Sequence, residues 1–187
     1  MKKFVSIFIL CFTIISIQAQ KTSNEPMIDY SDRVKTLDST LETFYAVISG
    51  EKGAKRNWTL FKYLFQPNAK LIPSGKNSEG FHLVSYLSPA DYIKKSEAWL
   101  KEQGFFEKEI SRTINTFGNI AHVFSTYEAY YSHTDEEPFM RGIHSFQLVN
   151  DEERWWIVNV FWNLETPDSP IPNVYLPKEQ TNTYSSY

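Results

Sequence analysis

The sequence predicts one α+β domain in which three helical segments come before a curved antiparallel sheet. Four runs in the C-terminal half are rich in Ile, Val, Phe, Tyr, Trp and Thr, residues that suit a half-buried pleated surface. They are residues 106–114, 120–131, 139–149 and 155–164. Short turn-forming segments separate them, and upstream the apolar residues recur at helical spacing. Helices followed by a meander predict an α+β architecture.

The first 20 residues have the pattern of a secretory signal peptide. A positive start, Met1 to Lys3, leads into the apolar run 4–17, and Ala19 supplies a small residue at a plausible cleavage point. The run is too short for a membrane-spanning helix of about 20 residues, so we expect no stable membrane insertion after cleavage at 19 or 20. The expected location is periplasmic or secreted.

Residues 21–28 have the composition of a linker, and the domain is predicted to span 29–166. From Asp29, apolar positions follow one helical face until Gly50. A second helix fits 57–65, with Pro67 expected to end it.

Between the second and third helices the sequence predicts short extended segments. Residues 70–73 form a strand candidate, 74–80 a loop, and 81–87 a further short strand or a lining segment. A third helix should begin after Ser88 as N-cap and end at Gly104. The Pro-rich tail, 167–187, is predicted to be irregular.

Composition excludes several function classes. The chain has 19 basic and 22 acidic side chains, and loss of Lys2 and Lys3 with the signal peptide would leave 17 basic ones and a net charge near −5. Such a balance argues against nucleic acid as a partner. The only cysteine, Cys11, lies in the signal peptide, so a cleaved chain has no disulfide or thiol chemistry. The 30 Phe, Tyr and Trp residues among 187 favour an aromatic core, an aromatic pocket, or both.

Six segments carry a resemblance to a known family: 41–48, 58–65, 67–72, 121–128, 141–148 and 154–158. Their sequences and the order of elements resemble the nuclear transport factor 2-like superfamily, which includes SnoaL-like cyclases, ketosteroid isomerase and scytalone dehydratase. The resemblance covers about 29–165 and is greatest to uncharacterised secreted bacterial members. It implies a cone-shaped fold, with the three helices on the concave face of the sheet and a cavity between them. Fold alone does not imply function.

If the last strands pair as a meander, side-chain alternation gives two different faces. The more apolar face is expected to line the cavity, and we predict His144 as acid-base and Tyr127 as hydrogen-bond donor. Predicted ligand-binding residues are Ser125, Phe146, Trp162, Trp58 and Val160, with Gly142 and Val158 on the same face. The opposite face carries His122, Thr126, Glu128, Arg141, Ser145, Gln147, Asn159 and Asn163, beside the apolar Phe124, Ile143, Ile157 and Phe161. There Glu128 and Arg141 are expected to form a cross-strand ion pair.

Three interpretations of function remain open. The first is a protein that binds a small, mostly apolar molecule without a cofactor, since no catalytic motif is present. The second is a cofactor-independent cyclase, isomerase or dehydratase that uses His144 and Tyr127. The third is an interaction module, a homodimer through the opposite face of the sheet. The four histidines lack ligand spacing such as His-x-x-x-His, so we predict no metal site.

Overall fold

The computed structural model describes residues 28–178, which form one six-stranded sheet with three α-helices on one face. The strand order is β2-β1-β6-β5-β4-β3. The strands are β1 (Phe65–Lys76), β2 (His82–Val84), β3 (Phe106–Phe117), β4 (Ile120–Tyr130), β5 (Met140–Asn150) and β6 (Trp155–Leu164). The α+β class and the predicted meander are confirmed. The pairing of β1 with β6 is parallel, whereas the other pairs are antiparallel.

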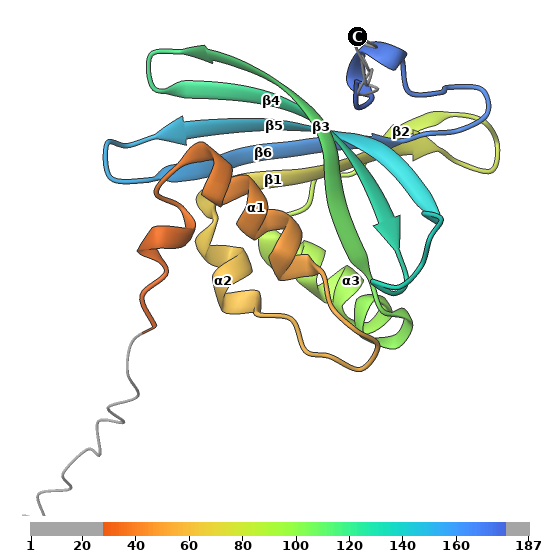
Figure 1. Ribbon diagram of the computed structural model, residues 1–187, viewed down its shortest axis with the longest axis horizontal. Helices are drawn as coiled ribbons and strands as arrows, with labels where there is room; N and C mark the ends of the chain where they lie inside the picture. The colour runs from red at the N-terminus through yellow and green to blue at the C-terminus, as the bar shows by residue number, and fades with distance from the viewer. Residues whose placement is uncertain (1–27, 179–187) are drawn as a thin grey trace, which may run out of the picture.

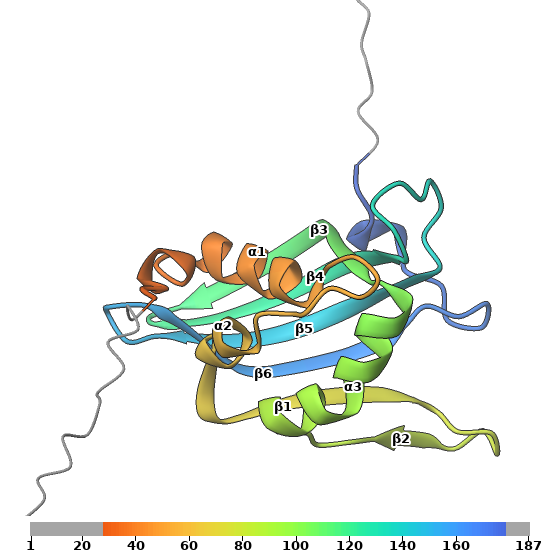
Figure 2. The same ribbon diagram turned by 90° about the horizontal axis from the view of Figure 1, so that it is seen from below.

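The three helices are α1 (Leu37–Ile48), α2 (Trp58–Tyr63) and α3 (Pro89–Gln103). Figures 1 and 2 show that they lie together on one side of the sheet. Their apolar side chains meet the inner face of the sheet in a single core that includes Leu41, Phe44, Phe61, Phe146 and Ile157. Burial of these side chains, at about 1.5–3 kcal/mol each, holds the two layers together.

Capping fixes where α1 and α3 begin. Ser88 accepts a hydrogen bond from the Asp91 N–H as the N-cap of α3, as predicted. The prediction that the first helix starts at Asp29 is wrong, because Thr36 caps α1 by accepting from the Ser39 N–H. The preceding residues Ser31–Arg33 form a separate 3-10 turn. Hydroxyl side chains at the N-cap satisfy amides that a helix end leaves free.

The segment around Pro67 differs from the prediction. Helix α2 ends at Tyr63, and Pro67 lies inside β1, where the pairing with β6 shifts between Phe65 and Lys70. A proline, which lacks an N–H, is tolerated at such an irregularity. Strand β1 also extends to Lys76 and pairs with β2, so the predicted loop is shorter. Strand β2 is the short strand predicted within 81–87, and its residues are exposed.

A bulge in β6 makes the predicted faces of Ile157 and Val158 wrong. Gln147 pairs with Asn159 but Leu148 pairs with Ile157, so Val158 is the extra residue. A bulge reverses the alternation on one side of it. Ile157, predicted for the opposite face, is therefore fully buried in the core, whereas Val158 is only partly buried.

The face of the sheet turned away from the helices, here called the outer face, is partly covered by the C-terminal segment (Figure 1). The Thr126 hydroxyl donates to the Tyr175 carbonyl over 2.7 Å, and the rings of Phe124 and Tyr175 lie 4.8 Å apart. Among residues 28–178 no helix is long and apolar enough to cross a membrane. The predicted signal peptide lies outside the described residues.

The predicted ion pair on the outer face does not form. Glu128 and Arg141 are cross-strand neighbours. However, Arg141 pairs with Glu165 at 2.7 Å, and Glu128 accepts a hydrogen bond from the Tyr130 hydroxyl. Each of the two charged side chains contacts a different residue instead. The strand register alone therefore did not determine which side chains pair.

Candidate functional site

His144 lies in the middle of the inner face of the sheet. Its neighbours across the register are Ser125 in β4 and Trp162 in β6. The residue is only 5% exposed. Because the central strands bury this face against the helices, His144 needs partners for its ring nitrogens from within the protein or from a ligand.

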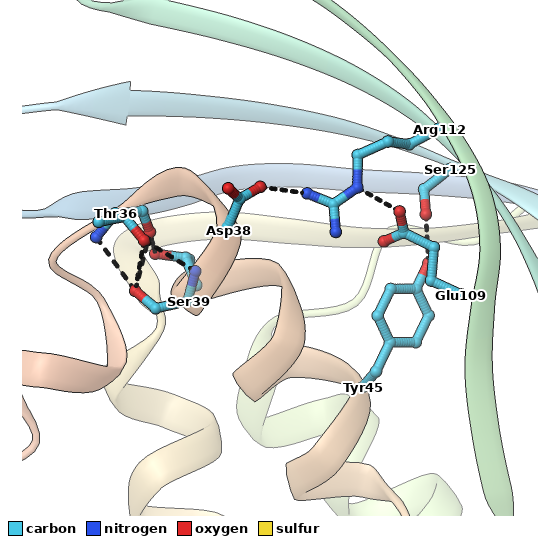
Figure 3. Close-up of polar contacts among 8 residues, drawn as sticks. Thr36, Asp38, Ser39, Tyr45, Glu109, Arg112 and Ser125 are labelled. Atoms are coloured by element: carbon cyan, nitrogen blue, oxygen red, sulfur yellow. Dashed lines mark hydrogen bonds and ion pairs between the residues drawn. The ribbon is translucent and has the colours of Figure 1, made fainter.

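Tyr45, on α1, supplies one of these partners. Its hydroxyl lies 2.7 Å from the Ser125 Oγ, as Figure 3 shows, and 3.2 Å from His144 Nδ1. Burial, together with the nearby Glu107 carboxyl, raises the pKa of the Tyr45 hydroxyl well above its ordinary value. Tyr45 therefore stays neutral and joins helix to sheet through hydrogen bonds that also orient the imidazole.

Tyr127 contacts the face of the imidazole rather than a ring nitrogen. The two rings are stacked, with centroids 4.2 Å apart and planes 17° from parallel. Gly142, opposite Tyr127 in the register, makes room for this arrangement. A Cβ atom at residue 142 would lie 2.6 Å from the Tyr127 hydroxyl oxygen, closer than side chains tolerate.

Glu107, near the start of β3, faces the second nitrogen of His144. Its Oε1 lies 3.9 Å from His144 Nε2, and its side chain is only 4% exposed. The Glu107 backbone N–H donates to Ser49 Oγ, which anchors this end of β3 to the end of α1. The contact between the carboxyl group and His144 is longer than a hydrogen bond.

Burial shifts the two ionisable groups in opposite directions. It raises the pKa of Glu107 to about 8 and lowers the pKa of His144 to about 3. Desolvation disfavours the charged form of each group. The Glu107 carboxyl therefore keeps its proton, and the His144 imidazole stays neutral. At neutral pH the contact therefore joins two mostly neutral groups and is not an ion pair, despite the short distance.

A cavity of 150 Å³ lies between α1, α3 and the sheet, beside Glu107 and His144. Its walls are mainly aromatic and aliphatic. They consist of Phe44, Ile48, Leu71, Tyr92, Ser96, Trp99, Leu100, Phe105, Glu107, Tyr127, Met140, His144 and Trp162. Trp99 is the most exposed of the aromatic residues, at 43%, and lies at the rim. The cavity therefore combines apolar walls with two buried polar groups.

A larger hollow of 1010 Å³ lies outside this cavity, along α1, β3 and the loop after β4. Its walls are more polar and include Glu42, Lys108, Arg112 and Asp135. Figure 3 shows the chain of polar contacts on this side, in which Arg112 bridges Asp38 of α1 and Glu109 of β3. These contacts hold α1 to the edge strand β3, so we interpret them as stabilising the fold.

The structure brings three of the predicted site residues to the cavity: His144, Tyr127 and Trp162. Ser125, Phe146 and Val160 are fully buried near them but do not line it. Trp58 points elsewhere, and its indole N–H donates to the Glu97 carboxylate over 2.8 Å. The catalytic and ligand-binding roles of all seven stay predictions.

Sequence reasoning missed Glu107 and the aromatic residues of α3. One signal was present: Glu107 and Glu109 alternate in a run that otherwise reads as a half-buried strand, so they share a face. That the face is the inner one depends on pairing with Ala129 and Tyr127 of β4. Among the described residues no group of three or more His, Cys, Asp or Glu side chains could hold a metal ion.

No protein-family model matches the chain, and no curated protein matches its sequence. Solved structures do resemble it. A cystatin-like protein of unknown function from Nostoc punctiforme has a TM-score of 0.53 at 10% identity, over 70% of this chain and 89% of that one. A candidate scytalone dehydratase from Novosphingobium aromaticivorans has a TM-score of 0.50 at 13% identity, over 76% and 91%.

An NTF2-like protein of unknown function from Silicibacter pomeroyi has 18% identity and a TM-score of 0.48, over 74% of this chain and all of that one. The likeness to the Nostoc punctiforme protein shows that the chain has a cystatin-like fold. The architecture expected from the sequence, helices on one face of a curved sheet, is therefore confirmed. At these identities the likeness is one of fold, and function has to be argued from the cavity itself.

Proposed function

We propose that this protein binds a small molecule with a mostly apolar surface in the cavity between α1, α3 and the sheet. One observation supports the proposal above the others: mainly apolar walls surround two buried polar groups, the Glu107 carboxyl and the His144 imidazole, which lie 3.9 Å apart. Buried polar groups in folded proteins are nearly always paired, with protein, water or ligand.

The size of the cavity limits the ligand. A volume of 150 Å³ is comparable to the engineered protein cavity that takes up benzene, about 150 Å³. The ligand, or the part of it that enters, is therefore about as large as one aromatic ring. Apolar walls with a few polar groups are typical of small-molecule sites.

Thermal-shift measurements with a panel of small aromatic and aliphatic compounds test the proposal. Ser96 lines the cavity, so Ser96→Leu should fill part of it, whereas Ala98 is exposed on the same helix and Ala98→Leu serves as the matched control. We expect at least one compound to raise the melting temperature of the wild type and of Ala98→Leu but not of Ser96→Leu. No shift in the wild type, or equal shifts in both variants, would contradict the proposal.

A second candidate function, acid–base catalysis without a cofactor, is favoured by the opposed pKa shifts of Glu107 and His144. A protonated acid beside an unprotonated base is the pairing that proton transfer at a carbonyl compound requires. In this scheme Glu107 donates a proton to the carbonyl oxygen, His144 accepts one from the adjacent carbon, and Tyr127 supports the imidazole by stacking.

Deuterium exchange at the α-carbon of cyclohexanone, followed by NMR, tests this second function. The wild type should accelerate the exchange above the buffer rate, and Glu107→Gln should lose most of the acceleration because the amide cannot donate a proton in the same way. The exposed Glu102→Gln variant is the control. A wild-type rate equal to that of buffer would exclude this reaction for this substrate class.

We also propose, on sequence grounds, export by the signal peptide 1–19 or 1–20 and a homodimer through the outer face. Apolar side chains on that face, including the half-exposed Phe161, support the dimer. N-terminal sequencing of the protein recovered from a periplasmic extract would test the export. A mature chain that still begins at Met1 would contradict it.

A further inference from the structure

The cavity holds one acidic group and no positively charged one. Glu107 is its only acidic residue, and none of its thirteen lining residues is a lysine or an arginine. His144 is held without a proton by burial and therefore supplies no positive charge. A carboxyl group at 4% exposure thus has no cationic partner among the residues that line this cavity. Buried carboxylates are costly unless a positive group or hydrogen-bond donors accompany them.

The walls around this carboxyl are aromatic rings from several elements, set at large angles to one another. The rings of Tyr92 and Trp162 meet at 82° with centroids 6.4 Å apart, and those of Trp99 and Phe105 meet at 63° and 5.9 Å. Trp162 also stands at 78° to the imidazole of His144. Rings placed in this way present both faces and edges to the space that they enclose.

We propose that the ligand is a small organic cation, a quaternary or tertiary ammonium group held between these aromatic rings and against the carboxylate of Glu107. This inference deepens the proposed function and rests on it. An ammonium group that carries methyl groups has a mostly apolar surface and suits apolar walls. Its positive charge is attracted to the faces of Trp and Tyr rings, and the attraction is strongest where water is excluded.

The charge state of Glu107 gives the inference a pH dependence. Because burial raises the pKa of Glu107 to about 8, the free protein at neutral pH holds a mostly protonated carboxyl, and a cation must displace that proton. Affinity for a permanent cation should therefore rise from pH 6 to pH 9, by up to about tenfold for each pH unit below the pKa.

The other titratable groups near Glu107 are His144 on β5, Tyr127 on β4, Tyr92 on α3, Tyr45 on α1 and Glu109 on β3. The pKa of His144 is lowered and those of the three tyrosines are raised, each mainly by burial, so these four keep one state from pH 6 to pH 9. Glu109 is held by Arg112 and lies outside the cavity lining.

Isothermal titration calorimetry with choline and its uncharged carbon analogue, 3,3-dimethylbutan-1-ol, tests the inference. The two probes have nearly the same shape, so the difference in their affinities measures the effect of the charge. We expect the wild type to bind choline at least about tenfold more tightly at pH 8.5, and to release protons as it does so. Glu107→Gln should lose this preference but still bind the alcohol, and the exposed Glu102→Gln should behave like the wild type.

Two results would overturn the inference, and they differ in what they mean for the proposed function. If the wild type binds the alcohol as tightly as choline, the cavity takes a neutral ligand and the proposed function stands. If it binds neither probe at millimolar concentration, the cation inference fails. The compound panel with Ser96→Leu then decides whether the proposed function fails as well.

Discussion

Glu107 and His144 are two ionisable side chains that the fold holds in their neutral forms, and the cost of doing so depends on pH. Glu107 has a raised pKa in the folded state, about 8 against an ordinary 4.5, so it stabilises the fold less as pH rises between these values. His144 has a lowered pKa, about 3 against 6.5, so its folded form gains stability as pH rises through that range. The two effects oppose each other between about pH 4.5 and 6.5, and Glu107 alone acts above it.

Removing the ionisable group at residue 107 should therefore stabilise the protein at high pH. We expect the free energy of unfolding of Glu107→Gln, relative to the wild type, to increase by about 1.4 kcal/mol for each pH unit between about 5.5 and 7.5. The increase should stop above about pH 8, where folded and unfolded states of the wild type are both ionised. Urea denaturation across this range measures it.

The exposed Glu102→Gln variant controls for the loss of one acidic side chain. Because Glu102 is exposed, its variant measures the effect of losing one acidic side chain at the surface. A pH-independent difference between Glu107→Gln and the wild type would mean that Glu107 is already ionised at neutral pH and has a cationic partner.

At the scale of elements, the connection between α3 and β3 positions Glu107. Gly104 ends α3 with a φ of +78°, and a Cβ there would lie 2.6 Å from the Tyr131 carbonyl oxygen. Phe105 then pairs with Gly50 in an isolated antiparallel bridge, which brings the start of β3 beside the end of α1. Glycine is required by both the backbone conformation and the close approach.

Gly104→Ala should destabilise the protein by more than the conformation alone explains. Gly53 has a similar φ of +82° but nothing within 4 Å of its Cβ position, so Gly53→Ala measures the conformational cost, about 1 kcal/mol. We expect Gly104→Ala to cost about 1–3 kcal/mol more, since backbone atoms must move. Thermal denaturation of both variants compares them. Equal losses of stability in the two variants would show that the connection between α3 and β3 accommodates a Cβ atom at residue 104 without strain.

At the scale of the whole molecule, the inner and outer faces of the sheet serve different purposes. The helices cover the inner face and enclose the cavity, while the C-terminal segment covers only part of the outer face (Figure 1). Phe161, at 43% exposure, and the half-buried Ile143 line a hollow beside that segment, together with Pro170 and Ile171. This surface is where we propose that a second copy of the chain binds.

Sedimentation velocity tests the proposed dimer. We expect the wild type to sediment as a dimer and Phe161→Glu as a monomer, because an unpaired carboxylate buried in an interface is costly. Phe117→Glu is the matched control, since Phe117 is exposed at the turn between β3 and β4 and lies away from the centre of the outer face. A monomeric wild type at micromolar concentration would exclude this dimer.

Much of the fold could be predicted because it depends on local patterns. The alternation of apolar side chains located β3 to β6 to within a few residues, and Ser88 with Pro89 marked the start of α3. The position of His144 and Tyr127 on the inner face also followed from alternation alone. Such patterns are specified by residues close together in the sequence, so they survive in any compact fold of this chain.

The tertiary structure alone decided which polar groups meet. Glu107 and His144 are far apart in the sequence, and they face each other only because β3 packs at the edge of a sheet that α1 and α3 cover. Because of the bulge at Val158, Ile157 lies in the core. Trp58 donates a hydrogen bond to Glu97 and does not line the cavity. Periodicity specifies which face a side chain is on. What covers that face, and therefore which polar groups come together inside the protein, is determined by packing between distant segments.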